Sequence, residues 1–558
     1  MQYSEDLLKR LKILLAPDGY TPRAEAEACY EPRNLPERAV VTRLAPSPTG
    51  FVHIGTIYMA LINKLVATQS KGVSILRVED TDKSREVENG VKIIADALEH
   101  FTLTPDEGVN ADGSSYGEYA PYIQSQRAKT YLGFAIDLLE KGRAYPCFAT
   151  PAELEANYKQ QQAEKVRPGY YGKWAIWREQ QEDAIQQALN AERPFVLRFR
   201  SQGSHVQKIQ IKDVLKGNLE LAQNDLDVPL IKSDINRLPT YHLAHLVDDF
   251  LMRINIVLRG DEWLPSTPLH IEFAKALGIP ILRYAHFAPI NIMDGSSKRK
   301  LSKRKDPEAD IKYFIDAGYP QEAILEYLVG LANSNFEDWR LQNPGAPLWA
   351  FPFTFEKWSK ARGALLDVKK LDDVSKNHIS GLPQETYWGE VLEWTKMHDS
   401  ELYEAMSADR GYTSEVLIIE RDGEKNRKDV AKWSDIPSEY GYFFDNIFVK
   451  RFQAQGRKEF LSDFDDTTIS EVASVFLNIF DPNDNREDWF DKLKAAAETV
   501  GFTADNKAFK QNPEQFNGNI ADFARIIRVL ITGKNRTPDL WTIIQIMGER
   551  RAKSRLPV

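Results

Sequence analysis

Hydrophobic residues at the start of the chain follow helical spacing and then give way to strand-like runs. Leu7, Leu11 and Leu14 lie on one face of a helix that we predict within residues 1–38, and a proline-rich joint follows it. The run AVVTRL at residues 39–44 is short, apolar and β-branched, which predicts a buried strand. The pattern assigns no role to residues 1–38.

This strand opens a sequence of strand, loop, helix and strand that fills about 40 residues. The loop APSPTG at residues 45–50 holds two prolines and a glycine, which end regular structure. Ile57, Leu61 and Leu65 then recur at helical spacing, and VSILRVE at residues 73–79 predicts a second strand. Strands that are joined through a helix lie parallel in one sheet, so a βαβ unit is predicted.

A second group of strand-like runs occurs further along the chain. Its strands are predicted at residues 231–235, 254–260 and 281–287, with helices near 243–252 and 268–277. These runs are typical of the other half of a nucleotide-binding sheet, and residues 90–230 are then inserted between the two halves. From about residue 350 the pattern is mainly helical, as in residues 508–531 and 539–553.

Composition narrows the class of protein. A chain of 558 residues exceeds one hydrophobic core, and about three to five domains are expected. We find no run of about 18 uncharged apolar residues, which argues against a membrane span, and charges interrupt the first helix, which argues against a secretory signal. Cys29 and Cys147 are too few for a disulfide framework or a structural zinc site. The expected compartment is therefore the cytoplasm.

The net charge of -9 does not exclude a nucleic-acid partner, because binding depends on the local charge that faces the phosphates. Residues 298–305 read KRKLSKRK and carry six positive charges in eight residues. The turn DGSS at residues 294–297 precedes them, so this stretch could form a mobile loop whose lysines neutralise a leaving pyrophosphate. Taken alone, a solvated basic loop or an RNA-backbone patch is the simpler interpretation.

The loop after the first strand is the other candidate site. Residues 46–56 read PSPTGFVHIGT and lead into a helix, which is where the sheet of a βαβ protein binds phosphate. No lysine follows Gly55, so the loop is not a Walker A motif. His53 could donate a hydrogen bond to phosphate oxygens, although in isolation an ordinary helix-capping histidine is the simpler interpretation.

These two segments occur together in a known family. HIGT at residues 53–56 and KLSKR at residues 300–304 resemble the HIGH and KMSKS signatures of class I aminoacyl-tRNA synthetases. The chain resembles glutamyl-tRNA synthetases in further stretches, which are RVEDTD (77–82), TYHLAHLVDD (240–249), VLRGDEWLPSTPLHI (257–271) and the C-terminal residues 528–556. The resemblance extends from about Val40 to Leu556, although residues 380–450 match poorly.

The resemblance implies an enzyme that activates L-glutamate with ATP to glutamyl-adenylate and transfers the glutamyl group to the 3′ end of tRNA(Glu). Mg²⁺ is expected to accompany ATP, and no zinc is expected because the cysteines that form a zinc cluster in some relatives are missing. Members of the family usually need bound tRNA for glutamate activation. We expect a monomer, and aminoacylation of purified tRNA(Glu) and tRNA(Gln) would decide whether tRNA(Gln) is charged as well.

The matched motifs also imply the site residues. Catalytic roles are implied for His53, Thr56, Lys300 and Lys303. Glutamate, whose carboxylates need cations and whose ammonium needs an anion, is expected to contact Arg43, Ala45, Ser47, Glu79, Tyr241, His245 and Arg259. ATP is expected to contact His53, Gly55, Thr56, Glu262 and Lys303, and no residue is expected to bind a resident metal.

Two of these positions depart from the common pattern. Thr56 replaces the second histidine of the first signature, and a threonine can still donate one hydrogen bond. His245 occupies a position that the family fills variably. A neutral ring there would hydrogen-bond the substrate, whereas a protonated ring would add positive charge.

Other interpretations exist for single residues and for the whole chain. Arg43 could pair with Asp80 or Asp82, and Tyr241 could be a core aromatic residue. A glutaminyl-tRNA synthetase typically carries a PEPNG-like first signature and a β-barrel anticodon part, and a truncated relative that modifies a tRNA base lacks the anticodon part. A nucleotidyltransferase with no RNA partner would leave residues 353–558 without a purpose, and a non-catalytic RNA-binding paralogue has no need for an intact charged pocket.

The implied fold class is α/β, with a Rossmann-type doubly wound parallel sheet, an inserted acceptor-binding domain and a mainly α-helical anticodon-binding region. The expected segments are an N-terminal extension (1–38), the first catalytic half (39–110), the insertion that binds the acceptor end of tRNA (111–238), the second catalytic half (239–293), the KLSKR loop with a stem-contact region (294–352) and the anticodon-binding region (353–558). Basic clusters near residues 298–305 and 525–555 are expected to face tRNA, with binding that weakens as salt rises.

Overall fold

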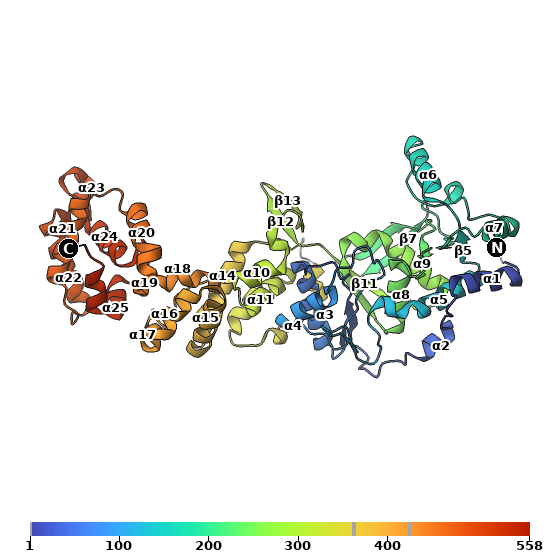
Figure 1. Ribbon diagram of the computed structural model, residues 1–558, viewed down its shortest axis with the longest axis horizontal. Helices are drawn as coiled ribbons and strands as arrows, with labels where there is room; N and C mark the ends of the chain where they lie inside the picture. The colour runs from blue at the N-terminus through green and yellow to red at the C-terminus, as the bar shows by residue number, and fades with distance from the viewer. Residues whose placement is uncertain (1–2, 360–363, 422–425, 558) are drawn as a thin grey trace. The chain divides into compact units, whose positions relative to one another are not determined.

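The computed structural model describes residues 3–359, 364–421 and 426–557, and the chain divides into two units. The first unit holds Met1–Tyr313 and Leu325–Asp367, and the second holds Phe314–Ile324 and Val368–Val558. Figure 1 colours both by residue number. In the described ranges no helix is both long enough and apolar enough to cross a membrane.

The first unit contains all but two of the strands that the structure describes. They are β1 (Val41–Leu44), β2 (Val73–Leu76), β3 (Gly108–Val109), β4 (Ser115–Tyr116), β5 (Ala144–Cys147), β6 (Val196–Phe199), β7 (Lys208–Asp213), β8 (Gly217–Ala222), β9 (Pro229–Ile231), β10 (Ile256–Gly260), β11 (Arg283–Phe287), β12 (Asn291–Asp294) and β13 (Ser297–Lys300). Its helices are α1 (Glu5–Leu15), α2 (Arg23–Ala28), α3 (Ile54–Gln69), α4 (Gly90–His100), α5 (Ala128–Glu140), α6 (Pro151–Ala163), α7 (Glu182–Asn190), α8 (Tyr241–Leu251), α9 (Thr267–Leu277), α12 (Phe336–Gln342) and α13 (Phe355–Ser359).

A parallel pair of strands confirms the predicted βαβ unit. β1 and β2 are in register from Val41 opposite Val73 to Leu44 opposite Leu76. The helix α3 joins them, and its residues Ile57, Leu61 and Leu65 are fully buried. On the other side of β1 the backbone N–H of Asn255 donates to the Val41 carbonyl at 3.0 Å, which brings β10 alongside.

The second group of strands agrees with the sequence in part. β10 and β11 are parallel, and a single bridge between Tyr284 and Asp213 adds β7 to the same sheet. The prediction of a strand at residues 231–235 in this sheet is wrong. Its first residue ends β9, which pairs antiparallel with β6 in a separate sheet of β5, β6 and β9. The next residues turn back, because the Asp234 carboxylate accepts a hydrogen bond from the Asn236 backbone.

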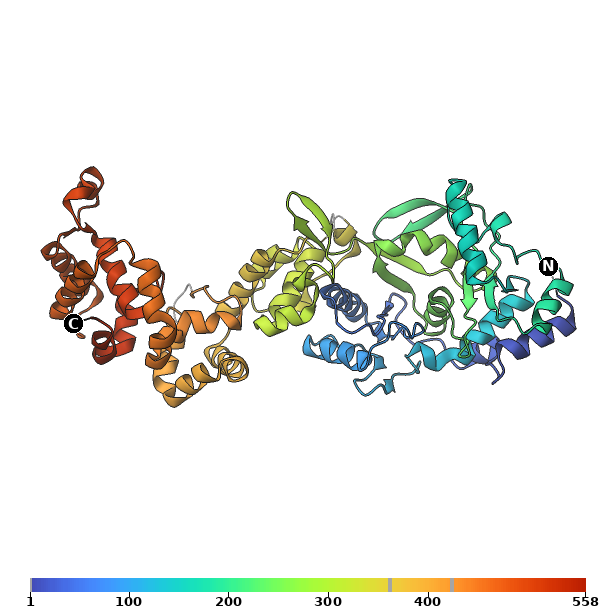
Figure 2. The same cartoon turned by 45° about the horizontal axis from the view of Figure 1, so that its top comes forward.

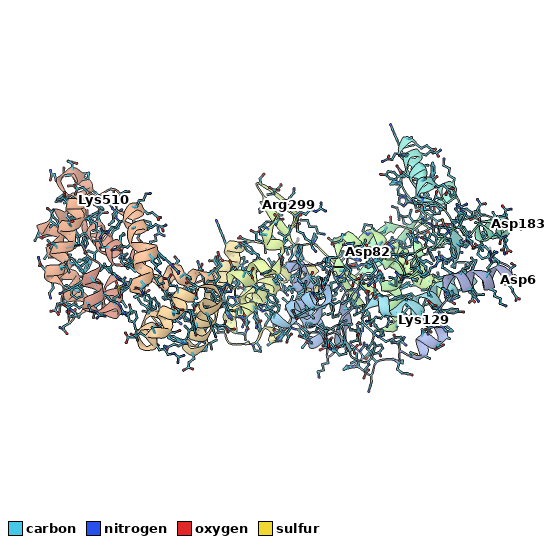
Figure 3. All side chains as sticks on the ribbon, viewed as in Figure 1. Asp6, Asp82, Lys129, Asp183, Arg299 and Lys510 are labelled. Atoms are coloured by element: carbon cyan, nitrogen blue, oxygen red, sulfur yellow. The ribbon has the colours of Figure 1, made fainter. Side chains whose placement is uncertain are left out.

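The helix α1 holds the N-terminal extension on the first unit. Leu7, Leu11 and Leu15 have no exposed surface, whereas Leu14 is 39% exposed. The prediction for Leu14 is therefore wrong, because steps of four residues along this helix reach Leu15. Arg10 Nη1 also donates to two side chains of α7, and Figures 1 and 2 show α1 beside α5 and α7. Asp6 of α1 and Asp183 of α7 lie at this same end of the unit in Figure 3.

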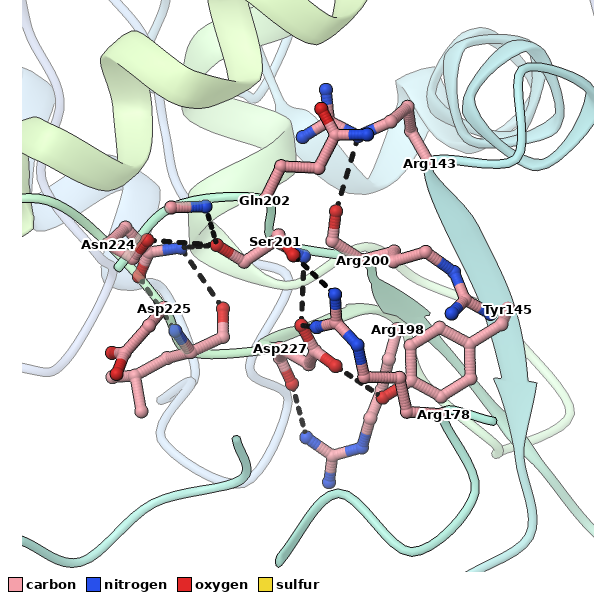
Figure 4. A network of polar contacts seen from close by, with 12 residues as sticks. Arg143, Tyr145, Arg178, Arg198, Arg200, Ser201, Gln202, Asn224, Asp225 and Asp227 are labelled. Carbon is pink, nitrogen blue, oxygen red and sulfur yellow. Dashed lines mark hydrogen bonds and ion pairs between the residues drawn. The ribbon is translucent and has the colours of Figure 1, made fainter. Parts of the chain in front are cut away.

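The buried carboxylate of Asp227 connects several parts of the inserted segment through hydrogen bonds (Figure 4). Asp227 is fully buried and accepts hydrogen bonds from Arg178 Nη1 at 2.7 Å, from the Tyr145 hydroxyl at 2.8 Å and from the Ser201 backbone at 2.8 Å. Close by, Glu272 of α9 accepts hydrogen bonds from the Gln202 backbone at 2.7 Å and from Arg143 Nη2 at 2.8 Å. Because α9 follows β10 in the chain, these bonds tie the insertion to the sheet.

The second unit is mainly helical, as predicted for the C-terminal part. Its elements are α14 (Val368–Gly381), α15 (Gln384–His398), α16 (Ser400–Ala408), α17 (Arg410–Leu417), α18 (Ile436–Tyr440), α19 (Asp445–Phe448), α20 (Ala454–Phe460), α21 (Asp466–Ile479), α22 (Arg486–Thr499), α23 (Asn506–Gln511), α24 (Ile520–Thr532), α25 (Leu540–Ser554) and the short strands β14 (Phe502–Thr503) and β15 (Gly518–Asn519). Two further helices, α10 (Ile311–Ala317) and α11 (Gln321–Ala332), have residues in both units. Within residues 508–531 the helix is broken, because a turn at Pro513 and the strand β15 separate α23 from α24.

We expect Leu11→Ala to lower the free energy of unfolding of the full chain by about 2–5 kcal/mol, because it empties a fully buried site in the core of the first unit. Urea denaturation measures this change. Leu14→Ala on the same helix is the matched control and should change the free energy by about 0.5 kcal/mol or less. Equal losses from both variants would contradict the burial pattern of α1.

Candidate active site

A cavity of about 430 Å³ lies at the carboxyl ends of β1 and β10, where an open parallel sheet binds its ligands. Eleven of the thirteen predicted site residues line it, which are Arg43, Ala45, His53, Gly55, Thr56, Glu79, Tyr241, Arg259, Glu262, Lys300 and Lys303. Two predicted residues are outside its lining. Ser47 is exposed, and His245 is fully buried.

His53 caps the helix α3 through one ring nitrogen. The Gly55 backbone N–H donates to His53 Nδ1 at 2.9 Å, so the proton of a neutral ring lies on Nε2. A Cβ at position 55 would lie 2.9 Å from this nitrogen, which explains the glycine. Burial, with Lys303 and Lys300 nearby, lowers the pKa of His53 to about 4. At neutral pH His53 is therefore an uncharged hydrogen-bond donor at the cavity.

Two lysines of the basic segment reach the cavity from the hairpin β12–β13 and the turn after it. Lys300 Nζ lies 3.0 Å from Glu262 Oε1, and Lys303 Nζ lies 4.2 Å from the centre of the Phe51 ring. Burial and the charge of Arg85 lower the pKa of Lys303. These contacts are weak enough to exchange for a more negative ligand, since a cation–π contact at an exposed site contributes about 0.5–1 kcal/mol.

Arg299, labelled in Figure 3, has a different role within the same segment. Its Nη1 and Nη2 donate to the two oxygens of Asp306 at 2.7 and 2.6 Å, and its Nε donates to Asp294 at 2.7 Å. These bonds close the hairpin on the turn that follows it. They leave Lys300 and Lys303 as the cations of the segment that line the cavity.

Behind the cavity, Asp249 of α8 joins two arginines from the neighbouring strands. Its Oδ1 accepts hydrogen bonds from Arg43 Nε at 3.0 Å and from Arg77 Nη1 at 2.6 Å, and its Oδ2 lies 2.9 Å from His245 Nδ1. Burial alone would raise the pKa of Asp249, but Arg43 and Arg77 hold it well below its ordinary value. The charge of Arg43 is therefore already neutralised before any ligand binds.

Asp80 and Asp82, which the sequence suggested as alternative partners of Arg43, form hydrogen bonds with other residues. Asp80 accepts a hydrogen bond from the Ser125 backbone at 2.7 Å, and Asp82 accepts one from the Ser84 hydroxyl at 2.7 Å. The alternative pairing of Arg43 with either aspartate is therefore wrong.

The adjacent Asp248 is equally buried and completes an ion network. Its Oδ1 accepts from Arg127 Nε at 2.7 Å, and its Oδ2 accepts from the Tyr131 hydroxyl at 2.7 Å and from Gln124 Nε2 at 3.0 Å. The network then holds three cations and three anions, which are Arg43, Arg77, Arg127, Glu79, Asp248 and Asp249. Its charges balance, so none is left uncompensated in the interior.

Glu79 is the anion of this network that lines the cavity, beside Arg43. Arg77 Nη2 donates to its Oε1 at 3.2 Å. Burial nevertheless raises the pKa of Glu79, with Arg77 and Arg43 acting against the shift. A cationic ligand group beside Glu79 would stabilise its ionised form.

Tyr241 and Trp263 form an aromatic wall of the cavity, with ring centres 4.4 Å apart. The His245 ring stacks on the other side of Tyr241, with the two planes 7° apart and the centres at 5.3 Å. Burial lowers the pKa of His245 to about 4, against the pull of Asp249. A neutral His245 packed between Tyr241 and Asp249 supports the wall from behind.

Arg259 differs from Arg43 in its partners. Its Nε donates to His286 Nε2 at 2.9 Å, its Nη1 to His270 Nδ1 at 3.1 Å and its Nη2 to the Thr267 hydroxyl at 2.8 Å. No carboxylate pairs with it among the residues that the structure describes. Arg259 therefore brings a buried and uncompensated positive charge to the cavity.

Several of these functional side chains have no role in the sequence analysis. Arg77, Asp248 and Asp249 stand inside the quoted stretches RVEDTD and TYHLAHLVDD, where charges in otherwise apolar runs were an available signal. His286 and Asp213 gave no such signal, because they lie far apart in the sequence and belong to no shared motif.

Comparisons with known proteins identify the family of the chain. The family model for tRNA synthetases class I (E and Q), catalytic domain, matches residues 39–338. The chain is 42% identical over 530 residues to the glutamate--tRNA ligase of Acetivibrio thermocellus, covering 95% of each. It is 41% identical over 527 residues to that of Clostridium perfringens, covering 94% of this chain and 96% of the relative.

A solved structure has the same fold. It is the crystal structure of a glutamate tRNA ligase from Elizabethkingia meningosepticum in complex with its amino acid, and it matches with a TM-score of 0.68 at 24% identity. The match covers 93% of this chain and 98% of that chain.

We expect Asp249→Asn to lower the free energy of unfolding by about 3–5 kcal/mol, because it leaves two buried arginines facing a neutral amide. Chemical denaturation measures the difference from the unchanged chain. Because the pKa of Asp249 is depressed in the folded state, this difference should persist at neutral pH and shrink only below about pH 4.

The matched control is Asp96→Asn. Asp96 pairs with Lys92 on the surface at 2.6 Å, with 48% of the aspartate side chain exposed. Its loss should cost about 1 kcal/mol or less. If the two variants lost equal stability, the buried network would not have the importance that its geometry indicates.

Proposed function

Because the chain belongs to the glutamate--tRNA ligases of the class I aminoacyl-tRNA synthetases, and so joins L-glutamate to tRNA(Glu) with ATP, we propose that the cavity described above is where glutamyl-adenylate forms. The observation that carries this proposal is the convergence of eleven residues, predicted from separate motifs, on one cavity. This cavity holds four cationic side chains, the carboxylates of Glu79 and Glu262 and an aromatic wall, which suit the charged groups of glutamate and ATP.

The amino-acid end of the proposed site follows from charge. L-Glutamate carries two carboxylates and one ammonium. Arg259 offers an uncompensated guanidinium to a carboxylate, and Glu79 offers a carboxylate to the ammonium. Arg43 contributes the N–H groups that do not bond to Asp249. Tyr241 and Ala45 line the space around the substrate.

The ATP end uses the two signatures. Neutral His53 and the Thr56 hydroxyl are proposed as donors to phosphate oxygens, with Gly55 allowing close approach. Lys303 and Lys300 are proposed to exchange their contacts with Phe51 and Glu262 for the phosphates. Glu262 then becomes available to the ribose.

The chemistry proceeds in two transfers. An oxygen of the glutamate α-carboxylate attacks the α-phosphorus, the bond to the bridging oxygen breaks, and pyrophosphate leaves. A terminal ribose hydroxyl of tRNA then attacks the acyl carbon, and AMP leaves as the ester forms. Neither step needs a nucleophile from the protein, so the cavity acts through positioning and through stabilisation of the phosphate charge.

We further propose that ATP enters as its magnesium complex, that the chain acts as a monomer and that it works in the cytoplasm. A hydrated Mg²⁺ held mainly by phosphates needs no dedicated protein cage. In the described part of the chain, no group of three or more His, Cys, Asp or Glu side chains could hold a metal ion.

The tRNA is proposed to contact three regions. The insertion at residues 111–238 is assigned to the acceptor end, residues 294–352 to the stem, and residues 353–558 to the anticodon. Support comes from the separate sheet of β5, β6 and β9 in the insertion and from the division into two units. The parallel pairs β1–β2 and β10–β11, with β10 beside β1, support a doubly wound sheet around the cavity.

Lys303→Ala should slow adenylate formation by about 10²-fold or more, because one charge-stabilising donor to the leaving pyrophosphate is lost. ATP–pyrophosphate exchange in the presence of glutamate and tRNA(Glu) measures the rate. At saturating tRNA(Glu), where a weaker stem contact does not limit the rate, Lys298→Ala is the matched control, since Lys298 is exposed on the same hairpin and does not line the cavity. A rate near that of the unchanged chain would remove Lys303 from the site.

Arg259→Ala should raise KM for glutamate by about 10²-fold or more, because a charged two-pronged contact to a carboxylate is lost. KM for ATP should stay unchanged in the same aminoacylation assay. Arg259→Lys keeps the charge without the planar fork, so its KM for glutamate should lie between that of the unchanged chain and that of Arg259→Ala. An unchanged KM for glutamate in Arg259→Ala would show that this arginine does not bind the substrate.

A further inference from the structure

The hydrogen bonds of Arg259 can be counted. A guanidinium has five N–H groups and no acceptor. Three of them donate, one each from Nε, Nη1 and Nη2, to His286, His270 and the Thr267 hydroxyl. One N–H remains on each Nη. The three acceptors are all neutral at neutral pH, so they fix the plane of the guanidinium without reducing its charge.

The proton position on His286 follows from the same bonds. Because arginine only donates, His286 Nε2 must be an acceptor, and the proton of the neutral ring must be on Nδ1. Nδ1 lies 2.7 Å from Asp213 Oδ2, to which it donates. Asp213 and His286 are both almost fully buried. A second oxygen of Asp213, Oδ1, accepts from the backbones of Leu215 and Lys216, each at 2.9 Å.

We propose that Asp213 and His286 are positioning residues for glutamate binding: Asp213 holds His286 in the tautomer that accepts from Arg259, and His286 thereby aims the two remaining N–H groups of Arg259 at a substrate carboxylate. This inference rests on the proposed role of Arg259 in binding glutamate. Asp213 and His286 act through Arg259 and do not touch the substrate themselves.

A neutral acceptor can orient Arg259 without neutralising its charge, whereas a carboxylate would neutralise it. Arg43 shows the alternative, because its Nε pairs directly with Asp249 and its charge is neutralised. Because the imidazole of His286 lies between Asp213 and Arg259, the negative charge of Asp213 does not contact the guanidinium. The guanidinium, which is itself buried, then meets the substrate with an oriented fork and an undiminished charge.

Asp213→Asn tests the tautomer directly. The two backbone N–H groups keep the amide oxygen of Asn at the Oδ1 position, so its NH₂ group faces His286 Nδ1. A donor there moves the ring proton to Nε2, where it opposes the N–H of Arg259 Nε. We expect KM for glutamate to rise about tenfold or more, as for the loss of a hydrogen bond to a charged group. KM for ATP should stay close to that of the unchanged chain, whereas the melting temperature should fall, because the backbone N–H of His286 loses its acceptor Asp213 Oδ2, which lies 3.2 Å away.

A second variant separates positioning from a structural role of Asp213. In His286→Gln the amide oxygen can accept from Arg259 whatever stands at position 213. Adding Asp213→Asn to His286→Gln should therefore change KM for glutamate little, and the two substitutions should be strongly non-additive. If Asp213 only shaped the turn at residues 213–216, Asp213→Asn would raise KM for glutamate by the same factor in the unchanged chain and in His286→Gln.

Lys216→Ala is the matched control in the same turn. It removes the ion pair of Lys216 with Asp261 at 2.9 Å and leaves the bonds of Asp213 and His286 in place. KM for glutamate should not change. A rise equal to that of Asp213→Asn would assign the effect to the turn and overturn the inference.

The outcomes distinguish this inference from the proposed function. If Arg259→Ala leaves KM for glutamate unchanged, the assignment of Arg259 fails. If Arg259→Ala raises it and Asp213→Asn does not, only the positioning by Asp213 and His286 fails. A parallel rise of KM for glutamate and for ATP in Asp213→Asn would also overturn the inference.

Discussion

Asp248 and Asp249, adjacent on α8, hold three arginines that come from different parts of the chain. Arg43 belongs to β1, Arg77 follows β2, and Arg127 precedes α5. Because every member is buried, loss of one charge would leave another unpaired in the interior, which is among the most costly defects of a folded protein. The network therefore fixes α8 against β1 and the end of β2, beside the cavity at the carboxyl ends of β1 and β10.

The same network decides where positive potential remains for the substrates. Asp249 neutralises Arg43, and Arg77 lies between three carboxylates. Arg259 has only imidazole and hydroxyl acceptors, so its charge is available to a ligand. The other available cations, Lys300 and Lys303, are on a hairpin and its turn and hold only weak or exposed partners. In the proposed site, selectivity for a dicarboxylic amino acid would thus depend on Arg259, which the interior leaves without a carboxylate partner.

The sequence predicted the parts of this arrangement that carry a local signal. The strand at residues 39–44, the helix with Ile57, Leu61 and Leu65, and eleven cavity residues belong to periodic runs or to recognisable motifs. Non-local contacts carry no such signal. Arg43 and Asp249 are separated by 206 positions, so no spacing rule could pair them. The error at residues 231–235 has another cause, because an Asx turn at Asp234 overrode an apolar run that otherwise resembles a strand.

Domain limits drawn on the sequence also separate residues that act together. Asp213 belongs by number to the insertion, yet its partner His286 is on β11, 73 positions away in the catalytic sheet. The bridge between Asp213 and Tyr284 is the sole pairing of β7 with β11. The acceptor that orients Arg259 is consequently set only when a strand of the insertion docks on the sheet. On the proposed role of Arg259, the insertion is therefore part of the amino-acid pocket, in addition to any contact that it makes with tRNA, and its removal should not leave a complete glutamate site behind.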